Sequence, residues 1–496
     1  MKKNSFIDNI NSLLDANTLQ VVSTLRGEFL AMLEDGERYQ MFPLSSKAFQ
    51  FALKACYQKN YHNYLSSNNM KEIIFYLESK AFENKLDYEL VNRIYNADNE
   101  FIIYDLNKET GEAVFIEDGE CTISTLDQLL FKRNDIFRNQ ITPNLKKSIK
   151  PEDLPKYVKK HFNLSSKDEV KLFSLYLVSC FWGLTISHPA LFISSEQGSG
   201  KSTFLRKLER LIDPKTIDLI GIPHKADDLE LRLSNSYFVA LDNLSYVSRS
   251  ISDILARAIT GGSITKRELY ENTKEVCFNI KCVLALNSVS MIFKEPDILD
   301  RMFIISLARF KSSKNRSEAE IWKEFEEDIP AILGCCFKCL AIALNDKEPI
   351  PPVDKIRLAD YHDCCIRIGK VLGYSPEEVT RLLFMNQKRV SQESVNESIA
   401  AQCLIEFMEE RDFYVGSVSE LYHEIKMVAK RKFIDVSLLP QGANHFSKQI
   451  NKVKNILESE YGIAYTIRNC GVNRKIRVNK IDENIDNIDS DEDSQN

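Results

Sequence analysis

The sequence predicts an α/β chain in which a parallel sheet covered by helices follows a mixed α/β region and precedes a module of helices and a hairpin. Three observations predict this fold class. Short apolar strands alternate with helices between about residues 157 and 312. A Gly-rich loop at 195–203 joins one of these strands to a helix. Helices followed by two short strands make up residues 397–480.

The composition is that of a soluble globular protein. Of the 496 residues, 44% are hydrophobic and 27% are charged, which excludes a disordered, collagen-like or coiled-coil chain. The length corresponds to about three domains. The net charge of −6 hides an asymmetry: residues 481–496 carry seven acids and no base, whereas residues 421–480 carry twelve Lys or Arg against four acids. A basic module followed by an acidic tail indicates contact with a polyanion.

Residues 1–135 are predicted as an N-terminal mixed α/β domain whose role the sequence does not indicate. Its expected helices are 49–57 and 70–82, and its expected strands are 101–106 and 113–116. The prolines of 136–156 predict a linker. Two overlapping capping boxes, at Ser165 and Ser166, then begin a helix that runs to about Gly183. Residues 313–396 are predicted to be helical, and 481–496 to be a disordered tail.

The 22 residues from Leu172 to Ile193 carry no formal charge and have the length of a membrane span. Pro189 divides them, however, so a buried helix followed by a core strand is the favoured interpretation. No secretory signal follows Met1, and the twelve cysteines are therefore expected to be reduced thiols of a cytoplasmic protein without membrane contact. Cys336 and Cys339 have the spacing of a zinc pair. They also continue an apolar helical stripe, which favours buried core cysteines.

The Gly-rich loop has the sequence and the context of a phosphate-binding P-loop. It follows the buried strand 190–195 and opens an amphipathic helix. Gly198 and Gly200 allow backbone N–H groups to face a β-phosphate, while Lys201 reaches the β and γ oxygens and the Ser202 hydroxyl binds Mg²⁺. The predicted nucleotide-binding residues are Gln197, Gly198, Ser199, Gly200, Lys201, Ser202 and Thr203. Ser195 stands where this motif usually has glycine.

Two further strands end in polar residues that suit nucleotide hydrolysis. Strand 236–242 ends at Asp242, and we expect it beside the P-loop strand, where its carboxylate holds Mg²⁺ with Ser202. The next residue, Asn243, can orient water but cannot accept its proton. The strand 280–286 ends at Asn287, which is predicted to face the γ-phosphate. The catalytic candidates are Lys201, Asp242, Asn243, Asn287 and Arg301.

Arg301 follows Asp297 and Asp300 and precedes a strand at 302–307. It is predicted to act as an arginine finger on the nucleotide of a neighbouring subunit. The alternative is an ordinary Asp–Arg surface pair at the start of a strand.

Taken in order, the segments 195–202, 241–245, 260–270, Asn287 and 296–301 resemble the superfamily-3-like AAA+ helicases. The likeness is greatest to the primase-helicase and replication-initiator ATPases of phages, pathogenicity islands and other bacterial mobile elements. The resemblance implies an AAA+ core over 157–312, a helical lid over 313–396, and a hexameric ring that uses ATP and Mg²⁺. The resemblance also makes Asn243 compatible with hydrolysis, because an Asp-Asn pair at this position is usual in that group.

In that family a β-hairpin between these motifs lines the ring channel and grips single-stranded DNA. The hairpin would run here from Ile264 to Leu286, with 271–274 near its tip. Arg267 and Lys274 are its candidate phosphate contacts. A solvated charged turn is the alternative interpretation.

Residues 397–480 are predicted as a winged-helix domain that binds duplex DNA. A capping box from Ser417 to Glu420 opens one helix, and the helix 446–459 has an apolar stripe with lysines off it. Strands at 464–468 and 475–478 complete the helix, turn, helix and basic hairpin of this fold. The predicted duplex contacts are Lys448, Lys452, Arg474 and Lys475. A basic but merely solvated face is the alternative.

These expectations combine into an ATP hydrolase and DNA helicase that assembles as a ring and unwinds DNA, for replication initiation of a mobile genetic element. An origin-binding initiator that uses ATP as an assembly switch without unwinding is the alternative. A degenerate ATPase acting as a scaffold is a third reading, suggested by Ser195 and Asn243.

Overall fold

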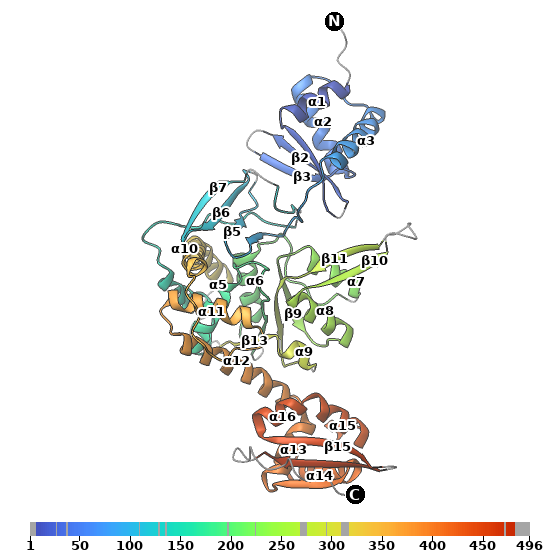
Figure 1. The fold of residues 1–496 in the computed structure, drawn as a ribbon, viewed down its shortest axis with the longest axis vertical. Helices are drawn as coiled ribbons and strands as arrows, with labels where there is room; N and C mark the ends of the chain where they lie inside the picture. Colours follow the sequence, from blue (N-terminus) through green and yellow to red (C-terminus); the bar gives the residue numbers. More distant parts are fainter. Residues whose placement is uncertain are drawn as a thin grey trace.

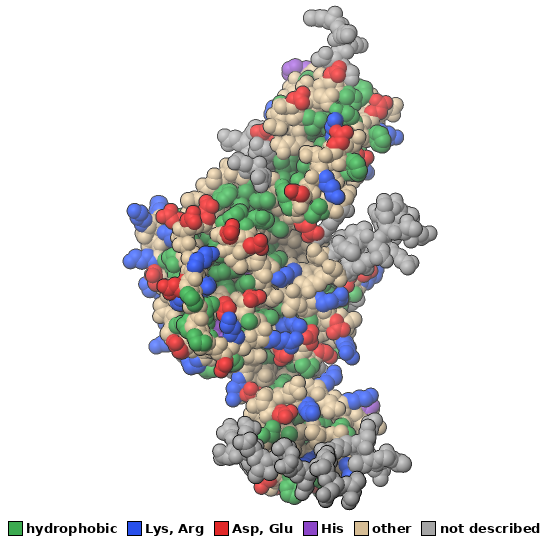
Figure 2. Space-filling model, in the orientation of Figure 1, with side chains coloured by type: hydrophobic (Ala, Val, Ile, Leu, Met, Phe, Trp, Pro, Cys, Tyr) green, Lys and Arg blue, Asp and Glu red, His purple; other side chains and the backbone are tan. Residues whose placement is uncertain are grey.

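The computed structural model describes residues 6–25, 27–35, 38–108, 110–126, 129–133, 136–195, 198–223, 225–267, 275–293, 295–308, 317–470 and 473–481. The described chain is elongated, with a small N-terminal unit at one end, a large central body, and a C-terminal unit at the other end (Figure 1). Lys and Arg side chains are interspersed with Asp and Glu over the visible face of the central body (Figure 2). That face therefore shows no large patch of purely positive or purely negative side chains.

In the part of the chain that the structure describes, the N-terminal unit packs three helices on an antiparallel sheet of order β1-β2-β3. Its elements are α1 (Phe6–Asp15), β1 (Leu19–Ser23), β2 (Phe29–Asp35), β3 (Arg38–Pro43), α2 (Lys47–Tyr61) and α3 (Ser67–Glu83). Both predicted helices of this region are present. Its core consists of residues between Ile10 and Ala81 and is separate from the other cores.

A second antiparallel sheet, of order β4-β5-β6-β7, belongs to the central body by its packing. Its strands are β4 (Ile94–Ala97), β5 (Phe101–Asp105), β6 (Glu112–Glu117) and β7 (Glu120–Thr125). Ile102, Tyr104 and Val114 share the largest hydrophobic core with the helices of the central body. A buried ion pair joins Arg93 to Asp213, with 2.8 Å between Nε and Oδ1. The core boundary therefore falls before β4, within the region predicted as one N-terminal domain.

A four-stranded parallel sheet lies at the centre of the molecule. Its strands are β8 (Ala190–Ser194), β9 (Phe238–Leu244), β12 (Val283–Ser288) and β13 (Met302–Ser306), in the order β13-β8-β12-β9. All four strands were predicted within a few residues, because each is a short apolar run. The prediction that β9 lies beside β8 was wrong: β12 separates them.

Helices cover both faces of this sheet, and the residues on its two faces belong to two different hydrophobic cores. The helices that precede or connect its strands are α4 (Leu154–His161), α5 (Lys167–Ser179), α6 (Lys201–Ile212), α7 (Ala226–Ser234), α8 (Arg249–Thr260) and α9 (Pro296–Leu299). A short 3₁₀ helix, η1 (Pro151–Asp153), precedes α4. Ser166 caps α5 by accepting a hydrogen bond from the Glu169 backbone N–H at 3.1 Å.

The predicted hairpin is present as an antiparallel pair, β10 (Gly262–Arg267) and β11 (Glu275–Ile280). Its second strand ends at Ile280, so the predicted end at Leu286 was wrong. Leu286 instead belongs to β12 of the parallel sheet, where it is fully buried. The tip, residues 268–274 with Lys274, lies outside the described residues, as does the side chain of Arg267.

Between the parallel sheet and the C-terminal unit, the described residues form the helices α10 (Glu318–Asn345), α11 (Ala359–Leu372) and α12 (Pro376–Asn396). Cys335, Cys336 and Cys339 on α10 are buried in the largest core, as are Cys364 and Cys365 on α11. Burial raises the pKa of the Cys365 thiol to about 12. Among the described residues, no group of three or more His, Cys, Asp or Glu side chains is placed to hold a metal.

Helix α12 lies along the free edge of β13 and leads to the C-terminal unit (Figure 1). The Asn386 amide accepts from the Ile304 N–H at 3.0 Å and donates to the Ile304 carbonyl at 2.7 Å. It therefore satisfies backbone groups that a further strand would otherwise pair. Arg389 also binds Ile304 and forms an ion pair with the buried carboxylate of Glu169 on α5. Burial raises the pKa of Glu169.

Within its described residues, the C-terminal unit packs four α-helices against an antiparallel sheet of order β14-β16-β15, with its own core. Its elements are α13 (Ile399–Glu409), β14 (Phe413–Ser417), α14 (Val418–Arg431), η3 (Val436–Leu438), α15 (Ala443–Lys452), α16 (Lys454–Tyr461), β15 (Ile463–Cys470) and β16 (Asn473–Lys480). The capping box of Ser417 and Glu420 is formed as predicted. The predicted helix 446–459 is instead divided at Val453, and β14 was not predicted.

Among the described residues, no helix combines the length and the apolar character needed to cross a membrane. The uncharged segment 172–193 is divided, as Pro189 predicts, into the end of α5 and the strand β8.

Candidate nucleotide site

The candidate site lies at the carboxyl edge of the parallel sheet, where β8 ends and α6 begins. Gly198 and Gly200 adopt φ angles of 81° and 87°, in the left-handed region that favours glycine. Gly200 is also the residue that precedes the first turn of α6. The apolar stripe of α6 is buried, with Leu205 and Leu208 fully inaccessible, and this fixes the helix N-terminus against the sheet. Glu196 and Gln197 lie outside the described residues.

The Lys201 side chain contacts the first residue of the Gly-rich loop. Its ammonium donates to the Ser195 backbone carbonyl at 2.6 Å. Burial lowers the pKa of Lys201, and the nearby Asp242 carboxylate opposes this effect. Ser199, two residues before Lys201, is 3% exposed, and its hydroxyl oxygen is buried without a hydrogen-bond partner in the described structure. Thr203 follows in the first turn of α6.

Three of the predicted side chains meet directly. The Ser202 hydroxyl donates to Asp242 Oδ1 at 3.0 Å, and the Asn287 amide donates to the same carboxylate oxygen. Asn287 Oδ1 in turn accepts a hydrogen bond from the Asn243 backbone N–H at 2.8 Å. Asn287 is 2% exposed, so one buried side chain binds both the Asp242 carboxylate and the Asn243 backbone N–H from within the sheet.

A local irregularity of β9 produces this arrangement. Leu286 of β12 pairs with Leu241, but Ser288 pairs with Leu244, so two residues of β9 stand opposite Asn287 alone. Asn243 accordingly has a φ of 54° and is exposed. A bulge of this kind redirects side chains at the end of a strand. Here it exposes Asn243 while Asp242 remains in contact with Ser202 and Asn287.

Ser195, the departure from the motif, has a structural role. Its hydroxyl accepts a hydrogen bond from the Leu307 N–H at 2.9 Å and donates to the Leu307 carbonyl at 3.2 Å. The pairing of β8 with β13 ends at Ser194 and Ser306, so this side chain extends it by one residue. The first residue of the loop is thereby fastened to the end of β13.

Arg301 is not part of this cluster. It immediately precedes β13, and its carbonyl accepts from the N–H of Ala190, the first residue of β8, at 2.8 Å. It therefore lies at the amino edge of the sheet, whereas the loop lies at the carboxyl edge. Its guanidinium pairs with Asp297 at 2.5 Å and is 13% exposed. Asp297 also binds Arg357, which precedes α11, at 3.2 Å.

The predicted duplex contacts are far from the loop in the chain and lie on the C-terminal unit. Lys448 on α15 and Lys475 on β16 are exposed. The Lys452 ammonium, at the end of α15, lies 3.5 Å from the Glu295 carboxylate of the central body. The side chain of Arg474 lies outside the described residues.

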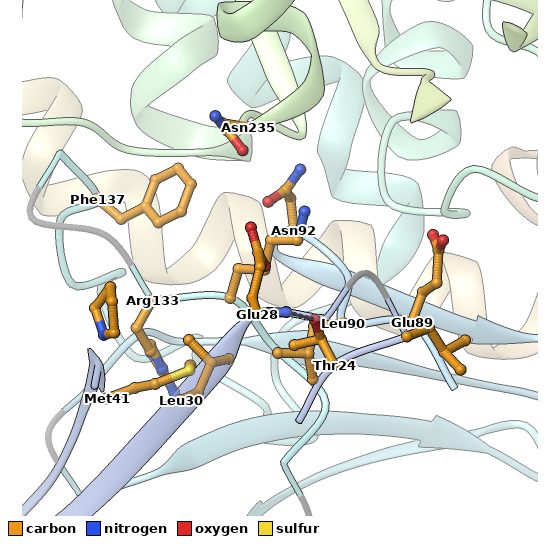
Figure 3. Close-up of a pocket in the computed structure, with 13 residues that line it drawn as sticks. Thr24, Glu28, Leu30, Met41, Glu89, Leu90, Asn92, Arg133, Phe137 and Asn235 are labelled. Atoms are coloured by element: carbon orange, nitrogen blue, oxygen red, sulfur yellow. Dashed lines mark hydrogen bonds between the residues drawn. The ribbon is translucent and has the colours of Figure 1, made fainter. Parts of the chain in front are cut away.

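A pocket that the sequence did not indicate lies between the N-terminal unit and the central body. It has a volume of about 250 Å³, and Glu28, Asn92, Arg133, Phe137 and Asn235 are among its lining residues (Figure 3). Asn92 donates to the Ser234 carbonyl at 3.1 Å, while its own Oδ1 is buried without a partner in the described structure. None of the predicted site residues that the structure describes lines this pocket.

Comparison with known proteins identifies the family. Residues 157–433, more than half of the chain, match the model of the family described as actinomycete integrative conjugative element replication protein. The chain belongs to this family. It is thus a replication protein of the mobile-element type. This agrees with the resemblance to replication proteins of mobile elements that the sequence shows. The match spans the whole candidate site, from α5 to beyond β13.

The search of curated proteins found no match to this chain. Among solved structures, the chain is similar to the A form apo structure of the NrS-1 C terminal region, with 12% identity and a TM-score of 0.40, over 95% of this chain and 98% of that chain. A second A form structure of the same region has 13% identity and a TM-score of 0.39, with the same coverage.

Proposed function

We propose that this replication protein is an ATP hydrolase and DNA helicase with an AAA+ P-loop core, a helical lid and a C-terminal winged helix. The observation that carries the proposal is the convergence of Lys201, Ser202, Asp242 and Asn287 at one sheet edge, next to a loop with two left-handed glycines. These are the groups that bind a nucleoside triphosphate and its metal ion in P-loop ATPases. Family membership adds the setting of DNA replication.

The residues fit ATP and Mg²⁺. The hydroxyl of Ser202 and the carboxylate of Asp242 are oxygen ligands, which Mg²⁺ prefers, and they already lie 3.0 Å apart. Bound Mg²⁺ neutralises charge on the β and γ phosphates. The buried hydroxyl of Ser199 lacks a partner in the described structure, and a phosphate oxygen would satisfy it. The Lys201 ammonium, which donates to the Ser195 carbonyl, would donate to a phosphate oxygen of the bound nucleotide.

The chain's own groups then position the attacking water rather than deprotonate it. Asn287 and Asn243 are joined by a hydrogen bond, and Asn243 is exposed next to Asp242. An amide can orient a water molecule toward the γ-phosphate, as the glutamine of small GTPases does. Hydrolysis without a general base depends on the orientation of the attacking water and on a further positive charge near the γ-phosphate.

Arg301 is that source in our proposal. Because it lies at the opposite edge of the sheet from its own loop, it can serve only the nucleotide of another subunit. Head-to-tail contacts of this kind close into a ring by rotation. A hexamer follows from the resemblance to ring helicases. The hairpin β10–β11 would line its channel, and the C-terminal unit would hold duplex DNA through Lys448.

ATP hydrolysis by the purified full-length chain, measured with and without single-stranded DNA, tests the enzyme. We expect DNA-stimulated hydrolysis that Lys201→Ala and Asp242→Ala each abolish. Lys225→Ala, which removes an exposed lysine before α7 that is not part of the cluster, is the control and should retain activity. Near wild-type rates in either site variant would show that the nucleotide site has been misplaced.

The alternative function, an origin-binding initiator that uses ATP only for assembly, is favoured by one observation. The residue after Asp242 is Asn243, so no carboxylate stands there to accept a proton from water. Strand displacement separates the two functions. A helicase displaces a labelled strand with ATP, whereas an assembly switch binds ATP and DNA and displaces nothing.

A further inference from the structure

We propose that the outward face of the C-terminal sheet β14-β16-β15 is a binding surface for single-stranded nucleic acid. This surface differs from the helix predicted to contact duplex DNA, but it includes Lys475 on β16, which was also predicted as a duplex contact. It rests on the alternation of side chains along three strands, on two exposed apolar side chains, and on the charges between them.

The alternation assigns side chains to the two faces of the sheet. Tyr465, Ile476 and Val478 point into the core of the C-terminal unit and are at most 1% exposed. Their neighbours along each strand therefore point outward. The register places Val415, Arg477 and Thr466 side by side in one row across the three strands. Parallel rows contain Phe413, Asn479 and Ala464 on one side, and Ser417 and Lys475 on the other.

The outward face combines apolar and cationic side chains. Phe413 is 70% exposed and Val415 is 57% exposed. Lys475 and Arg477 are both exposed on the adjacent strand β16. None of the described side chains on this face is acidic. An exposed aromatic ring next to cations is the arrangement by which proteins bind single strands: the ring stacks on a base, and the cations contact phosphates.

A single strand fits this face better than a duplex does. The faces of bases in a duplex are covered by their neighbours, whereas those of a single strand are available for stacking on Phe413. The charge of the face favours a polyanion over an apolar protein partner, because Lys475 and Arg477 would otherwise have to be desolvated without a counter-charge.

The position of the sheet supports this assignment. Helix α16 packs against α12, and ion pairs join Lys452 to Glu295 at 3.5 Å and Lys388 to Glu460 at 3.2 Å. The end of the predicted duplex-binding helix thus faces the central body. In Figure 1, α16 lies next to α12, and β15 lies beyond it, farther from the central body. The outward sheet face is therefore not covered by the described part of the central body.

The test is fluorescence anisotropy of the full-length chain with a labelled dT20 oligonucleotide and with a duplex of the same length, without nucleotide. We expect Phe413→Ala to weaken dT20 binding about tenfold, since stacking of one base on an aromatic ring contributes that order of affinity. Phe413→Trp should retain binding, and duplex affinity should stay within about twofold in both variants. Changing Lys475 and Arg477 to Ala together should lower the salt slope for dT20 by about 1.4, because each single-strand phosphate contact contributes about 0.7.

Phe433→Ala is the matched control. Phe433 is 97% exposed but lies on the turn after α14, off the sheet face, so its removal should leave dT20 binding unchanged. Wild-type affinity for dT20 in both Phe413→Ala and the double cation variant would overturn the proposal. So would a change of oligomeric state in Phe413→Ala without a change in dT20 affinity, because the face would then be a protein contact. The proposal does not depend on ATP hydrolysis: absence of ATPase activity in the wild type would refute the enzyme assignment and leave this test intact.

Discussion

Replacing Ser195 by glycine restores the residue usual at the first position of P-loop motifs, yet we expect the change to weaken the proposed nucleotide binding. The Ser195 hydroxyl makes two hydrogen bonds to the backbone of Leu307, at 2.9 and 3.2 Å. The opposite side of that segment is fixed as well, because Ala308 donates to the Asn163 carbonyl at 2.8 Å. The loop is therefore fastened to a rigid part of the fold. The carbonyl of the same Ser195 accepts the ammonium of Lys201.

The magnitude follows from the groups left without partners. Leu307 is 8% exposed, so removal of the hydroxyl leaves a buried N–H unpaired, which costs about 1 to 3 kcal/mol. If the loop must be ordered for nucleotide to bind, a loss of about 2 kcal/mol corresponds to about thirtyfold in the dissociation constant. Glycine adds backbone freedom to this loss, whereas alanine does not.

The assay is titration of a fluorescent ADP analogue into wild type, Ser195→Ala, Ser195→Gly and Ser195→Thr. We expect weakening by up to about thirtyfold in the alanine variant, at least as much in the glycine variant, and near wild-type affinity in the threonine variant, which keeps the hydroxyl. Thermal unfolding without nucleotide shows whether each variant is folded. Affinity in Ser195→Gly equal to or tighter than wild type would refute the reasoning.

Three further predictions concern assembly, duplex binding and pH. The Arg301→Ala variant should bind nucleotide but hydrolyse it poorly on its own. It should regain activity when mixed with Lys201→Ala subunits, because a mixed interface combines an intact loop with an intact arginine finger. Absence of rescue in a ring confirmed by mass measurement would contradict a finger acting between subunits. Lys448→Ala should lower the salt slope of duplex binding by about 0.9, and Lys452→Ala by less, because the Lys452 ammonium lies 3.5 Å from Glu295; equal slopes in the two variants would count against this difference. Burial lowers the pKa of His188 from 6.5 to about 4, and this imidazole interacts with the Gly183 carbonyl at 2.8 Å. Between those pH values the unfolded chain binds a proton that the folded chain excludes, so stability is full above pH 6.5 and falls as the pH decreases toward 4, by about 3 kcal/mol at about 1.4 kcal/mol per pH unit. The thermal midpoint should therefore fall less between pH 7 and pH 5 in His188→Gln than in wild type, and an identical fall would exclude His188 as the cause.

The sequence by itself determined the local chemistry of the candidate site. A strand, a Gly-rich loop and a helix are contiguous, so Gly198, Gly200, Lys201 and Ser202 were placed in their elements by spacing alone. The strands that end near Asp242 and Asn287 were also evident, because buried parallel strands are short apolar runs. Capping boxes similarly located the starts of α5 and α14.

Only the tertiary structure decided which of these elements are neighbours. Hydrophobic periodicity shows that a face is buried but not what covers it. The insertion of β12 between β8 and β9 is a matter of strand order, and it is what brings Asn287 to Asp242. The hydroxyl of Ser195 looked like a defect of the motif because its partner, Leu307, is 112 residues away in the chain.

The same limit explains the placement of whole segments. The strands β4–β7 follow the N-terminal unit in sequence, yet they pack into the core of the central body against α10, more than 190 residues later. Arg301 follows Thr203, the last residue of the loop, by 98 residues in the chain, and its place at the opposite sheet edge follows from the direction of β13. Local patterns determined the elements and their reactive groups. Long-range packing, which depends on the complementarity of buried surfaces, decided which groups meet.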